Sequence, residues 1–259
     1  MRQKFYISFL LIVVFSSSLF GQFRYTFHQF GNETVDFITQ PAKWEGSDWL
    51  KIGLIGGGAF LIMQTADQPI RDAVLRDQHY YKSAPVEFGR MWGELYAPVA
   101  LFGGFAAYSL ITDDLKTRKI AYEIGQASLY AAAVSFILKL AIGRARPYME
   151  EGKSSFHPFS AIINQDNKSM PSGHSTVAFI LSTVLSRNVH SPVLKVLAYL
   201  PAVLTLASRV YQDQHWTSDT FVGAAIGYFV ATWVVDQHEN NKSILEITSA
   251  FPLTIRIPL

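Results

Sequence analysis

Cysteine is absent from all 259 positions of the chain. Disulfide bonds, thiolate catalysis and cysteine-ligated metal sites are therefore excluded, although this absence does not identify a compartment. Charged residues are scarce as well, at 16% of the chain against about 25% in soluble proteins. The 22 basic and 20 acidic residues nearly balance. A polybasic surface for nucleic acid or for lipid headgroups is therefore not indicated.

Apolar runs long enough to cross a bilayer without interruption are few. A spanning helix needs about 20 apolar residues, and most runs here meet a charge sooner. The triple glycine at 56–58 has no strand before it, so it does not form a nucleotide-binding loop. Internal repeats and low-complexity segments do not stand out, and the length suits one helical bundle.

Hydrophobic residues are abundant, at 49% of the chain, and aromatic residues make up 14%. This balance favours a membrane protein, and the short runs leave a soluble helical protein as the alternative. We expect an all-α fold, a bundle of five or six mostly apolar helices that cross the membrane. The expected apolar helices cover residues 52–66, 95–112, 120–142, 172–185, a stretch ending at 209, and 220–235.

The N-terminus has the pattern of an export signal. Arg2 and Lys4 precede an apolar stretch, and small residues follow up to position 21. The signal at 1–21 is either cleaved before Gln22 or retained as a signal anchor. The rest of the chain divides into an N-terminal segment (22–94) with a glycine-rich helix and the charged connector 67–93, a core (95–236), and a tail (237–259) that forms a short strand or packs on the bundle.

A Pro-Ser-Gly-His turn leads into the apolar run that begins at Thr176. Ser172 is the expected N-cap of this helix, which leaves the amides of Gly173 and His174 as free donors. Such a helix start binds anions, because the unpaired N–H groups and the positive end of the helix dipole point the same way. Capping alone is the competing interpretation.

Two further blocks favour the anion site. Lys139 is followed after six residues by Arg146, and Arg209 is followed by His215 and then Asp219. Three cations, a hydroxyl with helix-start amides, and two histidines suit phosphoryl transfer. Cations and amides hold the phosphate oxygens, one histidine attacks phosphorus, and the other protonates the leaving oxygen.

The order and spacing of these blocks resemble the type 2 phosphatidic acid phosphatase superfamily, which also includes bacterial non-specific acid phosphatases and vanadium haloperoxidases. The blocks span residues 139–219, and many fixed positions coincide. Met170 departs from the pattern, because many members have an aromatic residue there. This departure affects the pocket wall and leaves the chemical groups in place.

The resemblance implies a role for each matching residue. His215 is the nucleophile and forms a phosphohistidine, Asp219 hydrogen-bonds the other ring nitrogen, and His174 is the general acid and later the base. No metal and no other cofactor is required, and a bell-shaped pH profile is expected. The phosphate oxygens are bound by Lys139, Arg146, Ser172, the Gly173 amide and Arg209.

Other polar residues near the blocks receive no catalytic role. Arg144 lies outside the motif and is expected to be a surface or headgroup charge, and His157 is expected to be a plain loop residue. The polar stretch 148–169 that contains His157 is either a lid over the site or a connector.

Charge patterning predicts the orientation of the bundle. The linkers 113–119 and 187–195 carry the cations, so the positive-inside rule places them in the cytoplasm. The active site then lies at the ends of the central helices on the periplasmic side of a bacterial inner membrane. A cleaved signal conflicts with this if residues 52–66 cross fully. A soluble periplasmic protein is the alternative.

The expected function is a metal-independent phosphatase for a lipid phosphate or pyrophosphate in the membrane. Phosphatidic acid, phosphatidylglycerol phosphate and undecaprenyl pyrophosphate are the substrate classes. The alternatives are a soluble non-specific acid phosphatase, a vanadate-dependent haloperoxidase and a non-enzymatic membrane scaffold. Nucleic acid is not an expected partner, and the sequence predicts neither the exact substrate nor the oligomeric state.

Overall fold

The computed structural model describes the backbone of residues 25–250 and the side chains of residues 25–239. Within this range the chain is helical, and the only β pairing is an isolated bridge between Arg144 and Phe156. The predicted all-α class is therefore confirmed. The predicted export signal at 1–21 lies outside the described residues.

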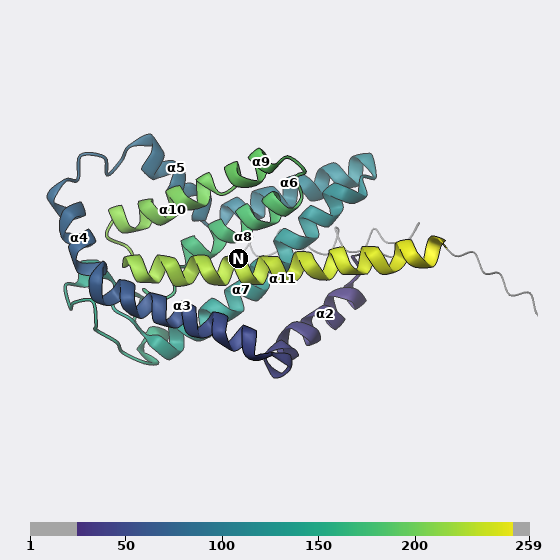
Figure 1. Ribbon diagram of the computed structural model, residues 1–259. Helices are drawn as coiled ribbons and strands as arrows, with labels where there is room; N and C mark the ends of the chain where they lie inside the picture. Colours follow the sequence, from purple (N-terminus) through teal and green to yellow (C-terminus); the bar gives the residue numbers. More distant parts are fainter. Residues whose placement is uncertain (1–24, 251–259) are drawn as a thin grey trace, which may run out of the picture.

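The N-terminal part consists of a run of helices separated by bends (Figure 1). Helix α3 is the predicted glycine-rich helix, and the charged connector forms two short helices, α4 and α5. The 3₁₀ turn η1 (Gln40–Lys43) joins α2 to α3. The helices are α2 (Phe27–Thr39), α3 (Gly46–Thr65), α4 (Asp67–Arg76) and α5 (Ala84–Gly93).

The C-terminal part contains the long helices. Helix α6 agrees with the predicted helix at 95–112, whereas α7 begins five residues earlier than predicted. Three 3₁₀ turns, η2 (Pro147–Met149), η3 (Ser160–Ile162) and η4 (Gln165–Asn167), interrupt the loop between α7 and α8. The helices are α6 (Tyr96–Thr112), α7 (Leu115–Ile142), α8 (Gly173–Arg187), α9 (Pro192–Leu197), α10 (Leu200–Tyr211) and α11 (Thr217–Ala250).

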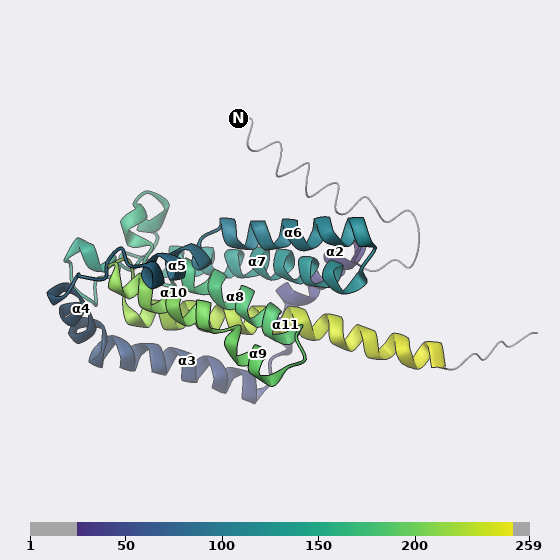
Figure 2. The same ribbon diagram turned by 90° about the horizontal axis from the view of Figure 1, so that it is seen from above.

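Helix α11 is the axis of the bundle. It runs the length of the molecule, with α3 beside it in the opposite direction (Figures 1 and 2). Of the predicted tail, residues 237–250 continue α11 and form no strand, whereas residues 251–259 lie outside the described residues. The buried core joins α7, α8 and α11 through apolar side chains that include Ile124, Leu181 and Val234.

Two glycines set the distance between α11 and α8. A Cβ atom at Gly223 would lie 2.4 Å from the carbonyl oxygen of Ser172, and one at Gly227 would lie 2.3 Å from that of Thr176. Both distances are shorter than van der Waals contact, so only glycine permits this approach. Small residues four apart are a common way for apolar helices to pack closely in lipid. The start of α8 is thereby held against the first turns of α11.

The bundle has the dimensions of a membrane protein. Three helical segments within the described residues are long and apolar enough to cross a bilayer: Leu115–Ile142, Pro192–Tyr211 and Thr217–Glu239. Two pairs of helices, α3 with α4 and α5 with α6, are also long and apolar enough to cross a bilayer if each pair is counted as one bent span, with bends of 49° and 68°. The number of candidate spans therefore reaches five, whereas α8, at 15 residues, is not one of them.

Candidate active site

The predicted site residues come together at one end of the bundle. Lys139 lies in the last turn of α7, His174 in the first turn of α8 and Arg209 near the end of α10. His215 occupies the loop that leads into α11, and the rings of the two histidines are 6.3 Å apart between centroids. The ends of α7, α8 and α10, the first turn of α11 with Asp219, and the loops that carry Arg146 and His215 therefore supply the groups that the sequence blocks predicted.

His215 is buried, with 2% of its surface exposed. Its Nδ1 lies 2.8 Å from the carbonyl oxygen of Ser169. A carbonyl only accepts, so Nδ1 carries the proton and donates it, which leaves the lone pair on Nε2. No hydrogen bond to Nε2 is made within residues 25–239, so this nitrogen is available to attack an electrophile.

Asp219 acts on His215 less directly than predicted. Its Oδ2 lies 3.9 Å from Nδ1 of His215, which is too far for a hydrogen bond. Oδ2 accepts instead from the hydroxyl of Ser169 at 2.5 Å and from the amide of Trp216 at 2.9 Å. Ser169 therefore stands between the carboxylate and the histidine. The sequence carries no signal for this residue, because its contact with His215 uses a backbone carbonyl and its hydroxyl bonds to a carboxylate 50 residues away.

The prediction that Arg144 is a surface or headgroup charge is wrong. Its side chain is fully buried and donates to the carboxylates of Asp219, at 2.6 Å, and Asp67, at 2.8 Å. Asp67, the first residue of the predicted charged connector, is only 1% exposed. Burying a charge is costly unless it is paired, and these three residues pair with one another although they are distant in sequence.

The three predicted cations face the same region. Lys139 donates to the carbonyl oxygens of Lys168 and Pro171, both at 2.6 Å, which leaves one of its three N–H groups for a ligand. The Nε atoms of Arg146 and Arg209 are buried and have no hydrogen-bond partner among the described residues. Buried donors are rarely left unpaired. An anion bound between the two guanidinium groups satisfies both.

His174 lies among charges of both signs. Its Nε2 is 3.5 Å from Nη1 of Arg209 and 3.3 Å from Oε1 of Glu94. Glu94 follows α5, and the sequence motifs give no sign of it. The side chain of His174 is 25% exposed, so it is far more accessible than His215. His174 therefore occupies the more open side of the site.

Ser172 is the N-cap of α8, as predicted. Its hydroxyl accepts from the amide of Ser175 at 3.4 Å, and its own amide donates to the carbonyl oxygen of Asp219 at 3.0 Å. The amide of Gly173, in the first turn, has no partner within the helix. The helix start is thus fixed against α11 with its dipole facing the site.

Burial controls the protonation of both histidines. It lowers the pKa of His215, which lies outside the candidate spans, well below 6.5, and the cations Lys139 and Arg146 lower this pKa further. Burial, followed by Arg209, lowers the pKa of His174 to about 4, while Glu94 acts in the opposite direction. Both rings are therefore neutral near pH 7 in the substrate-free site. A bound phosphate dianion favours the charged form of His174.

The remaining predicted features lie away from this centre. His157 is on the exposed loop between α7 and α8, where its Nε2 lies 2.7 Å from Glu151. Among the described residues no group of three or more His, Asp or Glu side chains is arranged to hold a metal ion.

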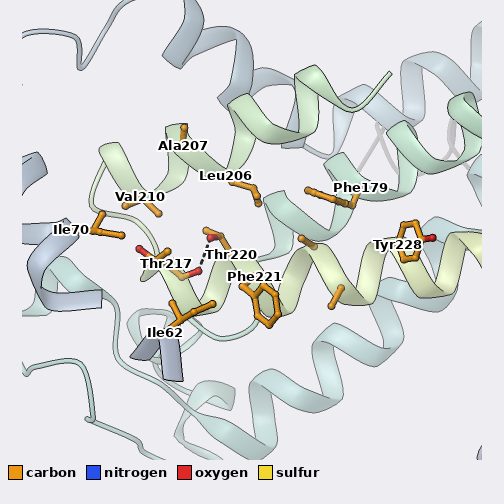
Figure 3. A pocket seen from close by; sticks show the side chains of 12 residues that line it. Ile62, Ile70, Phe179, Leu206, Ala207, Val210, Thr217, Thr220, Phe221 and Tyr228 are labelled. Carbon is orange, nitrogen blue, oxygen red and sulfur yellow. Dashed lines mark hydrogen bonds between the residues drawn. The ribbon is translucent and has the colours of Figure 1, made fainter. Parts of the chain in front are cut away.

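A separate apolar groove of about 600 Å³ runs along α10 and α11 (Figure 3). It begins at Val210 and Thr217, next to the loop that carries His215, and reaches Tyr228. Eleven residues of α11 correspond to about 16 Å of helix. None of the predicted catalytic or phosphate-binding residues lines the groove, so the anion site and the apolar groove are neighbouring and distinct features.

Fold and site together define a helical membrane protein whose bundle end holds a cationic anion site with two histidines. The profile of the PAP2 superfamily matches residues 123–243. A lipid A 1-phosphatase from Rhizobium etli is 35% identical over 198 residues, which are 72% of this chain and 82% of that protein. The chain therefore belongs to the PAP2 superfamily, and the resemblance inferred from the sequence blocks is confirmed.

Other relatives match over shorter stretches. A probable lipid phosphate phosphatase 4 from Arabidopsis thaliana is 29% identical over 167 residues, which are 54% of this chain. The chain spans 53% of that protein's length and less than two thirds of the length of two more lipid A 1-phosphatases.

Among solved structures, the first transmembrane PAP2 type phosphatidylglycerolphosphate phosphatase from Bacillus subtilis has a similar fold. The TM-score is 0.52 at 20% sequence identity, and the likeness covers 75% of this chain and 95% of that one. It supports the assignment of the fold as a membrane bundle.

Proposed function

We propose that this protein is a membrane phosphatase that hydrolyses a lipid phosphate or lipid pyrophosphate without a metal. The observation that carries the proposal is the convergence of Lys139, Arg146 and Arg209 on two histidines, with two guanidinium N–H groups that have no partner in the described part of the chain. Such a set binds the oxygens of a phosphate and stabilises the charge that develops on them. The names of the matched relatives and the apolar groove beside the site support a lipid substrate.

The proposed reaction has two displacements. Nε2 of His215 forms a bond to phosphorus as the bond to the leaving oxygen breaks, and His174 gives that oxygen a proton. His174 then takes a proton from water, the water oxygen bonds to phosphorus, and the bond to Nε2 breaks. Inorganic phosphate leaves, and both histidines return to their first state. The Nδ1–H to Ser169 hydrogen bond keeps the attacking nitrogen unprotonated throughout.

The decisive experiment is phosphate release by the purified protein in detergent with a chelator present. The panel contains phosphatidic acid, phosphatidylglycerol phosphate, undecaprenyl pyrophosphate, lipid A and a soluble aryl phosphate, with His215→Ala beside the wild type. We expect release from at least one lipid and none from the variant. Failure on every substrate would overturn the phosphatase proposal and leave halide oxidation with added vanadate to be measured. Faster release from the aryl phosphate than from every lipid would favour a non-specific phosphatase.

The site is proposed to face the outer side of a bacterial inner membrane. Lys119 donates to the side chain of Asn188 at 3.4 Å, so the cation-bearing linkers 113–119 and 187–195 lie together at one end of the bundle. The site is at the other end, where α11 begins. The positive-inside rule assigns the linkers to the cytoplasm.

The absence of native cysteine makes this orientation easy to test. An impermeant maleimide applied to intact cells stripped of the outer membrane should label Ser154→Cys, on the exposed loop before α8. His190→Cys, at an exposed position between α8 and α9, should react only after permeabilisation. The reverse pattern would place the site in the cytoplasm. A cytoplasmic site would agree with a cleaved export signal, because the mature chain would then begin outside and α3 with α4 would cross the membrane once before the site.

A further inference from the structure

Arg144 lies at the centre of a buried network that reaches the nucleophile. Its side chain uses all five of its N–H groups. Nε and one Nη2 hydrogen go to the carbonyl oxygen of Lys153, and Nη1 donates to Ser218 at 2.7 Å and to Asp219 at 2.6 Å. The other Nη2 hydrogen goes to Asp67 at 2.8 Å. A guanidinium so fully engaged has no rotational freedom and holds its partners in a fixed geometry.

Asp67 connects this network to an early part of the chain. It begins α4, directly after the bend that ends α3, and it lies outside the residues that the superfamily profile matches. Its carboxylate accepts from the amide of Ser218 at 2.8 Å and from the hydroxyl of Ser218 at 2.6 Å. Acidic groups are favoured at a helix N-terminus. Asp67 therefore ties the α3–α4 bend to the first turn of α11.

The network continues from Asp219 to the reacting nitrogen. One carboxylate oxygen of Asp219 is held by Arg144 and the other by the hydroxyl of Ser169. The carbonyl of Ser169 then fixes Nδ1–H of His215. A displacement of Asp219 moves Ser169, and a displacement of Ser169 turns the imidazole ring.

The charges of the network complement the proposed reaction. Asp67 and Asp219 carry two negative charges and Arg144 carries one positive charge, so the three residues together have a net charge of −1. None of the three side chains is exposed to solvent. When Nε2 of His215 bonds to phosphorus while Nδ1 keeps its proton, the ring becomes positive. A buried anion at short range stabilises that charge.

We propose that Asp67 and Arg144 are positioning residues that orient Asp219 and Ser169, and through them the attacking nitrogen of His215. This inference rests on the proposed phosphatase function. It assigns a role to the α3–α4 bend, which the three sequence blocks do not include. Neither residue touches the bound phosphate in this account.

Asp67→Asn tests the proposal with little change of shape, because the amide oxygen still accepts from Ser218. On the preferred substrate we expect kcat per folded molecule to fall about 10²-fold, the effect of a small misplacement of a reacting group, with KM unchanged. Ser169→Ala removes the hydroxyl bond to Asp219 and keeps the carbonyl, and we expect a fall of about tenfold. Because both changes act on one chain of contacts, kcat of the double variant should fall by less than the product of the two single-variant decreases.

Asp213→Asn is the matched control. This substitution removes the ion pair between Asp213 and Arg71, whose Oδ1 and Nε atoms are 2.8 Å apart. The pair joins α4 to the loop before His215 and does not involve Asp219. Asn suits the positive φ of 54° at this position. We expect wild-type kcat and KM from this control.

The outcomes separate this inference from the proposed function. A wild type that releases no phosphate from any substrate defeats the proposed function. An active wild type with unchanged kcat in Asp67→Asn, or with strictly multiplicative effects of Asp67→Asn and Ser169→Ala, defeats the positioning role. If Asp67→Asn does not fold, Ser169→Ala decides alone, and wild-type kcat in that variant overturns the proposal.

Discussion

Two buried histidines lie near opposite ends of the candidate span Thr217–Glu239 of α11 and have opposite surroundings. His238 lies between Glu123, 3.2 Å from Nδ1, and Glu33, 3.4 Å from Nε2. His215 has a carbonyl on one ring nitrogen, and the nearby cations Lys139 and Arg146 lower its pKa. Asp219 and His238 are about 28 Å apart along the helix. Both histidines are therefore buried beside a carboxylate. His215 differs from His238 because one of its ring nitrogens has no hydrogen-bond partner within residues 25–239 and is available to react.

The partners at the two ends show why the roles differ. Glu33 also accepts from Gln126 at 2.8 Å, and Glu123 accepts from Asn188 at 2.6 Å, so the carboxylates beside His238 join α2, α7, α8 and α11. At the other end the Nε donors of Arg146 and Arg209 have no partner within residues 25–239. Removing one member of a cluster whose charges are all paired leaves a buried charge without its partner and destabilises the fold. A cluster with open donors of one sign is suited to bind an anion.

The largest expected effect comes from removing each histidine in turn. His215→Ala should lower turnover by at least about 10⁴-fold, because the nucleophile is lost, while the thermal unfolding midpoint stays close to the wild type. His238→Ala should keep the turnover per folded molecule and lower the unfolding midpoint, because two buried carboxylates lose their partner at a cost of about 3–5 kcal/mol. Phosphate release and a thermal scan in detergent measure both. Equal turnover in the two variants would remove the distinction between the ends.

A smaller effect is expected from the same arginine substitution at each end. Arg209→Lys keeps the charge but loses the planar fork, so kcat should fall about 10²- to 10³-fold. Arg187→Lys changes an arginine that pairs with Asp236 at 2.7 Å and is 33% exposed, and it should leave kcat unchanged. Steady-state kinetics on the preferred lipid decide this. A similar fall in both variants would indicate a general effect on the bundle.

The sequence predicted most of the helices and the set of histidines and cations that form the site. It did not predict the residues behind them, Asp67, Arg144 and Ser169. The apolar run at 95–112 gave α6 almost to the residue, because helix formation there depends on local composition. The environment of Arg144 depends on Asp67 and Asp219, each about 75 residues away, and no local pattern reports such a pairing. Ser169 contacts His215 through its carbonyl, which every residue has, and its hydroxyl reaches Asp219, 50 residues further along the chain. The alternation of isoleucines in the tail suggested a strand, but the chain up to residue 250 continues as helix α11.

The smallest expected effect is on the pH dependence of stability. The pKa of His215 is lower in the folded protein than its unfolded value near 6.5, so below pH 6.5 the unfolded chain binds a proton that the folded chain does not. The stability that a neutral His215 preserves is therefore present above pH 6.5 and is lost at about 1.4 kcal/mol per pH unit below it. The unfolding midpoint of the wild type should fall more steeply towards pH 5 than that of His215→Ala.

The matched control for this measurement is His157→Ala, which changes an exposed loop histidine. This variant should follow the wild-type curve throughout. Parallel curves for the wild type and His215→Ala would show that the buried histidine does not titrate as its surroundings require.

The most direct test of the account is to trap the covalent intermediate. The protein is mixed with substrate labelled in its phosphate, quenched in alkali after milliseconds, and digested for mass spectrometry. The account predicts an alkali-stable, acid-labile phosphate on His215, absent from His215→Ala and reduced in its rate of formation in Asp67→Asn. Turnover with phosphate on no histidine, or on His174 in place of His215, would contradict the assignment of the nucleophile.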